Sequence, residues 1–380
     1  MVAVKHMTTS TTGDLGRKRS IWAMLHLDPV LLGLLLILMA GGLFVLYSGA
    51  DRNLQLVEAQ AIRLGIGLIV MLVTAQLDPA FFRRWSPWLY LGGMLALVAV
   101  LVAGVGAKGA QRWLDLPGLP RVQPSEAMKL VVPMATAWYL SRHYLPPSFR
   151  RVMLGLVLVV MPMALIILQP DLGTSLLVGM AGIFVVFFAG ISWKLITAFF
   201  AMVSVSAPLM WVFVMRDYQK QRVLTLLDLQ SDPLGAGWNI IQSKTAIGSG
   251  GMEGKGWLQG TQSHLEFLPE SHTDFIVAVL AEEFGFIGMS VLLTLYFLII
   301  LRSLYIAVMA QDSYSRLLAG ALTMTFFMYV FVNIGMVSGL LPIVGVPLPL
   351  ISYGGTSAIT LLAAFGVLMS IQTHRRMIAA

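Results

Sequence analysis

The chain has 380 residues, of which 58% are hydrophobic and only 11% are charged, and its mean hydropathy is +0.83. This composition excludes an ordinary soluble domain, and continuous apolar runs of about 20 residues predict membrane-spanning helices rather than a transmembrane barrel. The formal net charge of +7 does not imply nucleic acid, because scattered Lys and Arg in short loops also orient membrane helices. The sequence has no cysteine, so disulfides are excluded.

The hydrophobic pattern predicts an all-α polytopic membrane protein with ten spans. They run approximately over 29–49, 57–77, 86–106, 125–141, 150–169, 172–190, 192–215, 274–301, 316–341 and 354–373. We expect one membrane domain (29–373) between an N-terminal tail (1–28), without a cleavable signal peptide, and a short C-terminus (374–380). An even number of spans puts both termini on one side. The larger share of Lys and Arg lies in short segments on that side, which predicts cytoplasmic termini.

The remaining cations lie mostly in two longer outer segments, around 107–124 and 216–273. Cations there do not help insertion, so they indicate an anionic ligand on the outer side. The large outer loop, 216–273, is rich in glycine. We expect it to contain short amphipathic pieces, around Gln219–Leu229 and Trp238–Ala246, that lie on the membrane surface.

Charged residues enter the apolar layer at the start of the fourth span. Glu126 and Lys129 are three residues apart and share one helix face after Pro124, which favours a helix start. An unpaired ammonium about one turn into the membrane is costly. The two residues form either a structural ion pair or part of a polar cavity that binds anions with Arg112, and we favour the cavity.

The fifth and sixth spans are joined by a very short outer turn that contains Asp171. This carboxylate is expected to cap the sixth span, and a second role in lining the outer cavity is left open. The glycine-rich segment Gly248–Gly256 does not match a phosphate-binding P-loop. We interpret it as flexible turns near a substrate. Four neighbouring residues match no known metal spacing: His264, Glu266, Glu270 and His272.

Asp274 is the residue that we expect to carry the chemistry. It leads from the polar loop into the eighth span, where its alternative role is a helix N-cap that Thr273 can also fill. A carboxylate at the membrane edge, with cations nearby, suits a general base beside an anionic leaving group. Glu282 and Glu283 follow inside the apolar run, so they must be paired, protonated or turned towards a polar cavity.

The stretch Asn333–Ser357 contains three prolines, which forbid a regular helix. Non-helical backbone at membrane depth has to be buried in protein or line a polar cavity. We therefore predict a re-entrant loop before the tenth span, with a tight structural connection as the alternative. Free N–H groups are expected to point at phosphate oxygens from four residues: Ser352, Tyr353, Gly354 and Gly355.

Four motifs together resemble the SEDS family of bacterial cell-wall proteins (shape, elongation, division and sporulation). They are QPSEAMK (Gln123–Lys129), QPDLGT (Gln169–Thr174), the segment Ala246–Gly288, and GVPLPLISYGGTS (Gly345–Ser357). The resemblance covers essentially all ten spans. Phe267 and Ala281 resemble the elongation branch more than the division branch.

The resemblance implies a peptidoglycan glycosyltransferase of the bacterial cytoplasmic membrane. Its substrate would be lipid II, and its partner a class B penicillin-binding protein that cross-links the glycan. The essential loop aspartate of the family matches Asp274, and its charged cavity residues match Arg112, Glu126 and Lys129. With the residues singled out above, the expected substrate-binding set is Arg112, Glu126, Lys129, Asp171, Ser352 and Gly354. No metal ligands are assigned, although a divalent cation, Mg²⁺ or Mn²⁺, would suit the pyrophosphate.

In the expected reaction, Asp274 takes the proton from the 4-hydroxyl of an acceptor GlcNAc. That oxygen attacks the donor MurNAc with inversion, and polyprenyl pyrophosphate leaves while Arg112 and Lys129 offset its charge. Two alternatives belong to other classes: a lipid II flippase, which broken helices around a polar cavity would also suit, and a non-catalytic scaffold for the transpeptidase.

Overall fold

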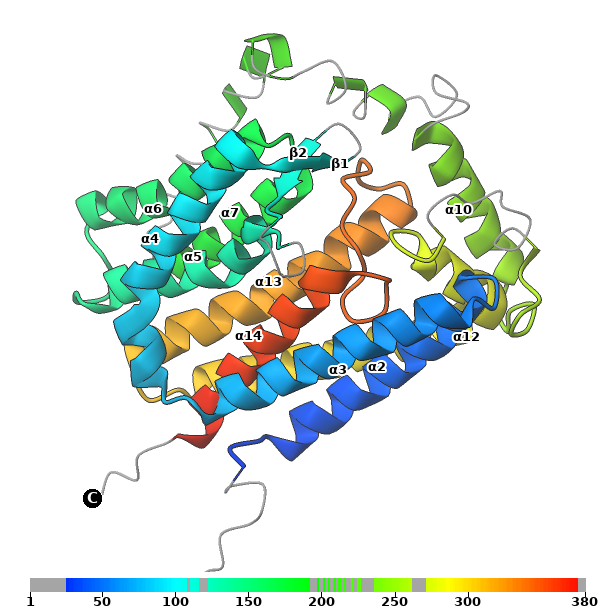
Figure 1. Ribbon diagram of the computed structural model, residues 1–380, viewed down its shortest axis with the longest axis horizontal. Coiled ribbons are helices and arrows are strands. Elements are labelled where there is room, and N and C mark those ends of the chain that lie inside the picture. Colours follow the sequence, from blue (N-terminus) through cyan, green and yellow to red (C-terminus); the bar gives the residue numbers. More distant parts are fainter. Residues whose placement is uncertain are drawn as a thin grey trace, which may run out of the picture.

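The computed structural model describes residues 25–107, 110–115, 122–191, 236–261 and 271–374, with isolated positions between 197 and 226. It is a bundle of long helices (Figure 1). The helices are α2 (Pro29–Gly49), α3 (Leu54–Gln76), α4 (Pro79–Ala103), α5 (Pro124–Ser141), α6 (Phe149–Leu168), α7 (Leu172–Phe188), α10 (Ala236–Gly250), α12 (Ile276–Val308), α13 (Ser313–Val337) and α14 (Gly355–Thr373). A small antiparallel hairpin, β1 (Val105–Ala107) and β2 (Ala110–Trp113), follows α4.

These helices confirm nine of the ten expected spans, with ends shifted by a few residues. The seventh, 192–215, and the amphipathic piece Gln219–Leu229 lie outside the described residues except for isolated positions. Among the described helices, seven are long and apolar enough to cross a membrane. Of the other two matching helices, α7 has only 17 residues, and α5 carries two charged residues in its first half.

The starts of the helices follow from local chemistry. Several begin where a short polar side chain accepts a hydrogen bond from a first-turn N–H group. These N-caps are Asp28, Asn53, Asp78, Asp171 and Asp312. Proline in the first turn, where its missing N–H costs nothing, also begins α2, α4 and α5.

Helix α13 runs through the middle of the bundle and is packed against α5, α7, α12 and α14 (Figure 1). Helix α14 lies along α3, and α6 lies along α7. Hydroxyl groups inside α13, such as those of Thr323 and Thr325, are bonded to carbonyl groups one turn earlier. These two hydroxyl groups are therefore satisfied within the helix before they meet the apolar core.

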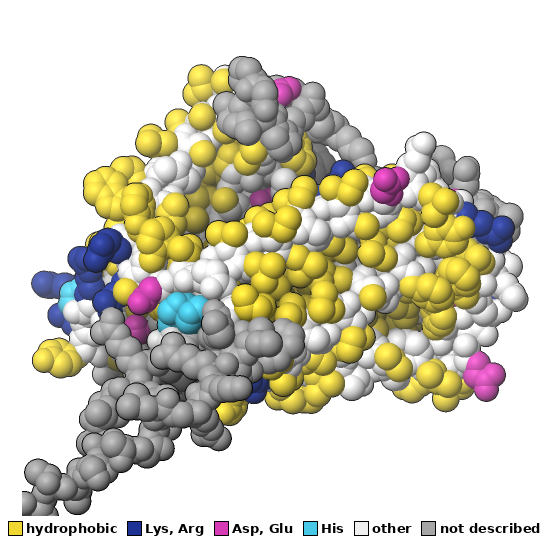
Figure 2. Space-filling view, turned by 60° about the horizontal axis from the view of Figure 1, so that its bottom comes forward, with side chains coloured by type: hydrophobic (Ala, Val, Ile, Leu, Met, Phe, Trp, Pro, Cys, Tyr) yellow, Lys and Arg dark blue, Asp and Glu magenta, His cyan; other side chains and the backbone are white. Residues whose placement is uncertain are grey.

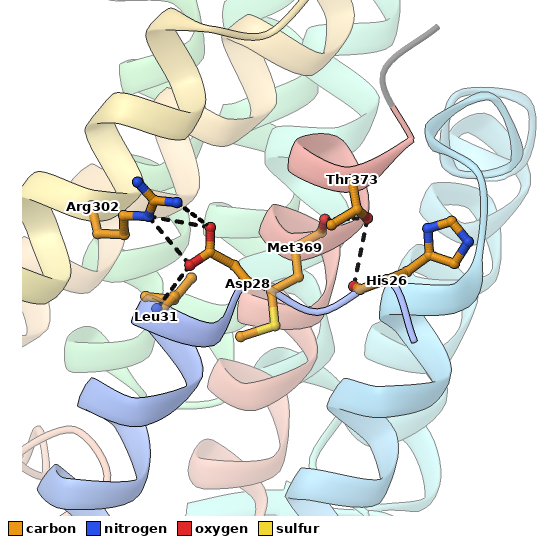
Figure 3. A network of polar contacts seen from close by, with 6 residues as sticks. All are labelled: His26, Asp28, Leu31, Arg302, Met369 and Thr373. Atoms are coloured by element: carbon orange, nitrogen blue, oxygen red, sulfur yellow. Dashed lines mark hydrogen bonds and ion pairs between the residues drawn. The ribbon is translucent and has the colours of Figure 1, made fainter. Parts of the chain in front are cut away.

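The two ends of the described chain meet at one end of the bundle. The rings of His26 and His374 are stacked with centroids 3.9 Å apart, and Thr373 donates a hydrogen bond to the His26 carbonyl. Beside them, Arg302 of α12 donates hydrogen bonds from both Nε and Nη2 to the buried carboxylate of Asp28 (Figure 3). This arrangement agrees with an even number of spans. We call this the inner end and the opposite one the outer end.

Helix α10 contains the expected amphipathic piece Trp238–Ala246, but its apolar face is not spread on a membrane surface. Ile240, Ser243 and Ala246 form a buried stripe at helical spacing, and α10 packs on α12 and α13. The Ser243 hydroxyl donates to the Val337 carbonyl over 2.7 Å at the end of α13. The apolar face that the sequence pattern assigned to the membrane surface therefore packs against α12 and α13.

Candidate active site

Asp274 lies half-buried in the turn that leads into α12. The N-cap of this helix is Phe275 rather than Asp274, and Phe275 makes no side-chain capping bond. The side chain of Asn333, from α13, donates to the Asp274 carbonyl over 2.9 Å and to the Val346 carbonyl over 2.7 Å. One buried amide thus fixes the backbone of Asp274 between α13 and the loop that follows α13.

That loop, 338–354, passes directly beside the carboxylate. A Cβ atom on Gly345 would lie 3.5 Å from Asp274 Oδ2, and Gly345 has a φ of +72°, which favours glycine. The loop is non-helical as expected, and several of its carbonyl groups accept hydrogen bonds from side chains on neighbouring helices. Tyr296 donates to the Pro349 carbonyl over 2.8 Å, and Gln60 donates to the Ser352 carbonyl over 3.1 Å. The prediction of buried, irregular backbone is confirmed.

The expectation of free N–H groups in this loop is wrong for three of the four residues. The N–H groups of Ser352, Tyr353 and Gly354 donate to Leu348, His272 and Gln60, respectively. The Ser352 side chain is buried as well, and its oxygen accepts from the Leu348 N–H over 2.8 Å. Ser352 and Gly354 hold the loop in shape, and their contact with substrate stays a prediction.

Glu126 and Lys129 form a buried ion pair on α5, with Nζ and Oε1 2.6 Å apart. The ammonium also lies 4.9 Å from the ring centroid of Tyr329 on α13. Tyr329 and Asn333 are four residues apart on that helix, so they share one face. The face of α13 that holds the backbone of Asp274 is therefore the face that contacts Lys129, about one helical turn away.

Arg112 and Asp171 form a second charged pair at the outer end, 3.7 Å apart. Asp171 Oδ1 accepts from the Thr174 N–H over 3.2 Å, which confirms the helix cap. Its other oxygen accepts from Gln123 over 3.3 Å, and Arg112 also donates to the Pro170 carbonyl over 2.6 Å. The Asp171 carboxylate therefore caps α7 and also contacts Arg112 and Gln123 of the outer cluster.

The two pairs are joined through the first residues of α5. Gln123, which contacts Asp171, stands three residues before Glu126. Helices α5, α7, α12 and α14 all begin at this outer end, and α13 ends here. The structure therefore brings Arg112, Asp171, Glu126, Lys129 and Asp274 to one end of the bundle, opposite the chain termini. The sequence did not single out Tyr329 and Asn333, the residues of α13 that link this set.

Glu282 and Glu283 are buried, and the ion pair of Glu282 with Lys255 confirms the first of the three expected states for Glu282. Glu282 accepts from Lys255 over 2.7 Å and from the Thr261 N–H over 2.8 Å. Glu283 accepts from the Ser48 hydroxyl and from the Leu258 N–H. The two carboxylates hold the segment after α10 against the first part of α12.

Helix α12 is broken just after these carboxylates, at Gly285, whose φ of +61° is non-helical. Backbone hydrogen bonds cross the break: Lys255 N–H to Glu282 O, Gly256 N–H to Glu283 O, Phe286 N–H to Gly251 O, and Ile287 N–H to Met252 O, all of 2.9–3.1 Å. The glycine-rich segment therefore replaces the missing helical bonds of α12. It is a close-packed clamp in this structure, where the sequence had predicted flexible turns.

Of the four residues weighed as a metal site, the structure describes His272 alone. His264, Glu266 and Glu270 lie outside the described residues, and the ring of His272 packs edge-on to Tyr353. Among the residues that the structure describes, no three His, Cys, Asp or Glu side chains come together.

Comparison with known proteins gives matches over nearly the whole chain. A family model described as a cell cycle protein of the FtsW, RodA and SpoVE type matches residues 19–377. Peptidoglycan glycosyltransferase MrdB of Escherichia coli is 52% identical over 366 residues, 96% of this chain and 99% of the relative. A probable peptidoglycan glycosyltransferase FtsW of Geobacter metallireducens is 35% identical, covering 92% of this chain and 95% of the relative.

Solved structures agree with these relatives. A chain from a structure described as "Structural coordination of polymerization and crosslinking by a peptidoglycan synthase complex" matches with a TM-score of 0.81 and 32% identity, covering 92% of this chain and 98% of that one. The rod shape determining protein RodA of Thermus thermophilus matches with a TM-score of 0.68 and 29% identity, over 91% of this chain and 96% of its own. The chain is therefore a multi-pass membrane protein that belongs to the SEDS family, the family of FtsW, RodA and SpoVE.

Proposed function

We propose that this chain is a peptidoglycan glycosyltransferase of the bacterial inner membrane that polymerises lipid II during cell elongation. The relative MrdB, a peptidoglycan glycosyltransferase by name, matches it over nearly the full length of both chains. Its identity to MrdB is higher than its identity to the FtsW relative, which supports the elongation branch. Both termini lie on the cytoplasmic side in this proposal, so the charged set at the outer end faces the periplasm, where lipid II is used.

The single observation that carries the proposal is the placement of Asp274. Its carboxylate is half-buried beside the loop 338–354, and the Asn333 amide fixes its backbone. In the proposed reaction, this carboxylate removes the proton from the 4-hydroxyl of the acceptor GlcNAc as that oxygen attacks the donor. An α-linked donor then becomes a β-1,4 bond in one inverting step, which requires one base and no covalent intermediate.

The cations of the outer end differ in their access to a leaving pyrophosphate. The Arg112 side chain is 37% exposed, so its guanidinium is the group that we expect to bind phosphate oxygens directly. Lys129 is buried and paired with Glu126. It would act mainly through its field, which is stronger in a site that excludes water.

The proposal includes no resident metal. Two of the outer carboxylates, Glu126 and Asp171, already face cations, and no three candidate ligands meet among the described residues. A divalent cation, Mg²⁺ or Mn²⁺, is proposed only as a companion of the pyrophosphate, and no step of the mechanism depends on it.

The proposed partner is a class B penicillin-binding protein, which would cross-link the strands that this chain makes. One of the matching structures is described as a peptidoglycan synthase complex in which polymerisation and crosslinking are coordinated. The test is therefore to measure polymerisation of purified lipid II by the chain alone and with this partner, for wild type and for Asp274→Ala.

Glycan strands from the wild type, and none from a folded variant that still binds the partner, would support the proposal. Strands from both proteins would move the base elsewhere, to Glu126 first. If neither made strands with an authentic partner present, the enzyme assignment would fail. A vesicle assay for lipid II translocation would then distinguish a flippase from a scaffold.

A further inference from the structure

A second polar site lies at the inner end, away from the residues proposed for catalysis. A cavity of about 380 Å³ opens between the first turns of α4 and the last turn of α5. Its lining residues are Ala80, Arg83, Arg84, Trp138, Ser141 and Arg142. Three of these six side chains carry a guanidinium group and none is acidic. We call this cavity the arginine pocket.

The guanidinium groups of the arginine pocket form no ion pairs within the described chain. The Arg142 guanidinium lies 3.9 Å from the ring centroid of Trp138. Arg83 also lines a neighbouring cavity of about 220 Å³ with Asp78 and Asp312. Those carboxylates already accept hydrogen bonds as helix caps.

Exposed aromatic side chains place the pocket at the level of lipid headgroups. Phe81, Trp85 and Trp88 on the first turns of α4 are 42%, 46% and 65% exposed, and aromatic side chains of this kind gather at membrane–water interfaces. His374, from the C-terminal end of the chain, lines the neighbouring cavity. Figure 2 shows the larger group of Lys and Arg side chains at the left end of the molecule and a smaller group at the right end, with mostly hydrophobic flanks between them.

We propose that the arginine pocket binds the phosphate headgroup of an anionic phospholipid from the inner leaflet. A guanidinium group presents paired N–H donors that match phosphate oxygens. Basic pockets between transmembrane helices on the cytoplasmic side take headgroups of this class. The acyl chains then lie along the apolar outer surface of α4, next to the exposed aromatic side chains.

The simpler explanation is that these arginines only orient the helices during insertion, and a matched control separates the two. Arg84→Gln/Arg142→Gln removes two charges from the pocket. Arg150→Gln/Arg151→Gln removes two charges from the first turn of α6, on the same side of the membrane but outside the lining. Arg83 is kept in both variants, because it also faces the acidic neighbours.

The measurement is native mass spectrometry of the full chain in detergent, titrated with phosphatidylglycerol or phosphatidylethanolamine. We expect the wild type to retain phosphatidylglycerol in preference, and the pocket variant to lose about tenfold or more of that affinity. The control variant should lose less than about twofold. Equal losses in the two variants, or equal retention of the two lipids by the wild type, would overturn the proposal.

A charge-preserving variant and a soluble competitor complete the experiment. Arg84→Lys/Arg142→Lys keeps the charge, so it should recover part of the affinity, and its melting temperature checks that substitution has not unfolded the helix ends. Inorganic phosphate serves as a competitor. Displacement of the lipid by millimolar phosphate would overturn a lipid site in favour of a soluble anion, whereas continued retention of the lipid supports the proposal.

Discussion

Two ion pairs with buried carboxylates, Asp28–Arg302 at the inner end and Glu126–Lys129 at the outer end, differ in how completely their oxygens are satisfied. At the inner end, Asp28 uses both oxygens, on Arg302 and on the Leu31 N–H (Figure 3). At the outer end, Glu126 Oε1 binds Lys129, but its buried Oε2 has no hydrogen-bond partner among the described residues. A buried acceptor left open needs an explanation. Both carboxylate oxygens of the inner pair accept hydrogen bonds, so we interpret that pair as structural. In the outer pair, Glu126 Oε2 can still accept a hydrogen bond from a ligand.

The largest effect on activity is expected from Asp274→Asn, at the outer end. The amide keeps the shape of the side chain but cannot accept the proton, so polymerisation should fall by about 10²–10⁴. The melting temperature should hardly change, because the amide has nearly the same size and shape as the carboxyl group and Asp274 is not the N-cap of α12. Initial rates with lipid II measure the effect. A normal rate in a normally folded variant would remove Asp274 from the role of base.

Lys129→Met should cost both activity and stability. It leaves the Glu126 carboxylate buried without its cation, which costs about 3–5 kcal/mol of unfolding free energy. Denaturation in detergent measures this loss. The double variant Glu126→Gln/Lys129→Met removes both charges and should recover most of the stability but none of the activity. Recovery of activity in the double variant would show that the outer pair is only structural.

Asp28→Asn tests the inner pair and should affect stability alone. The neutral amide weakens the hydrogen bonds to Arg302, which costs about 1.5–3 kcal/mol. The loss of unfolding free energy is smaller than for Lys129→Met, because the Arg302 side chain is 26% exposed and its charge is not left fully buried. Polymerisation per folded molecule should stay normal. A large fall in that specific activity would contradict the division between the two ends.

The smallest effects are expected from two helix caps, one at each end. Asp171→Ala and Asp312→Ala each remove a bond to a first-turn N–H group, so each should lower stability by about 1 kcal/mol. Only Asp171 also holds Arg112, so only its loss should slow polymerisation, by about tenfold at most. Equal activities of the two variants would separate Arg112 from the reaction.

Much of the fold could be predicted from the sequence, because long apolar runs leave few other solutions in a membrane. The approximate bounds expected for the first span, 29–49, coincide with those of α2, whose start is marked by Asp28 and Pro29. The irregular loop before α14 was also predicted from its prolines. The seventh span could not be compared, since it lies mostly outside the described residues. The N–H groups of the loop were misjudged, because their partners Gln60 and His272 are distant in sequence.

The sequence by itself determined the polytopic helical fold, the family and the identity of the charged residues, because hydrophobic length, capping residues and long motifs are local signals. Only the tertiary structure decided how those residues are used. It turned the glycine-rich segment into a clamp on the break in α12, and it fixed Asp274 through an amide on α13. Buried polar groups must find partners wherever the chain brings them, and those partners are not adjacent in the sequence.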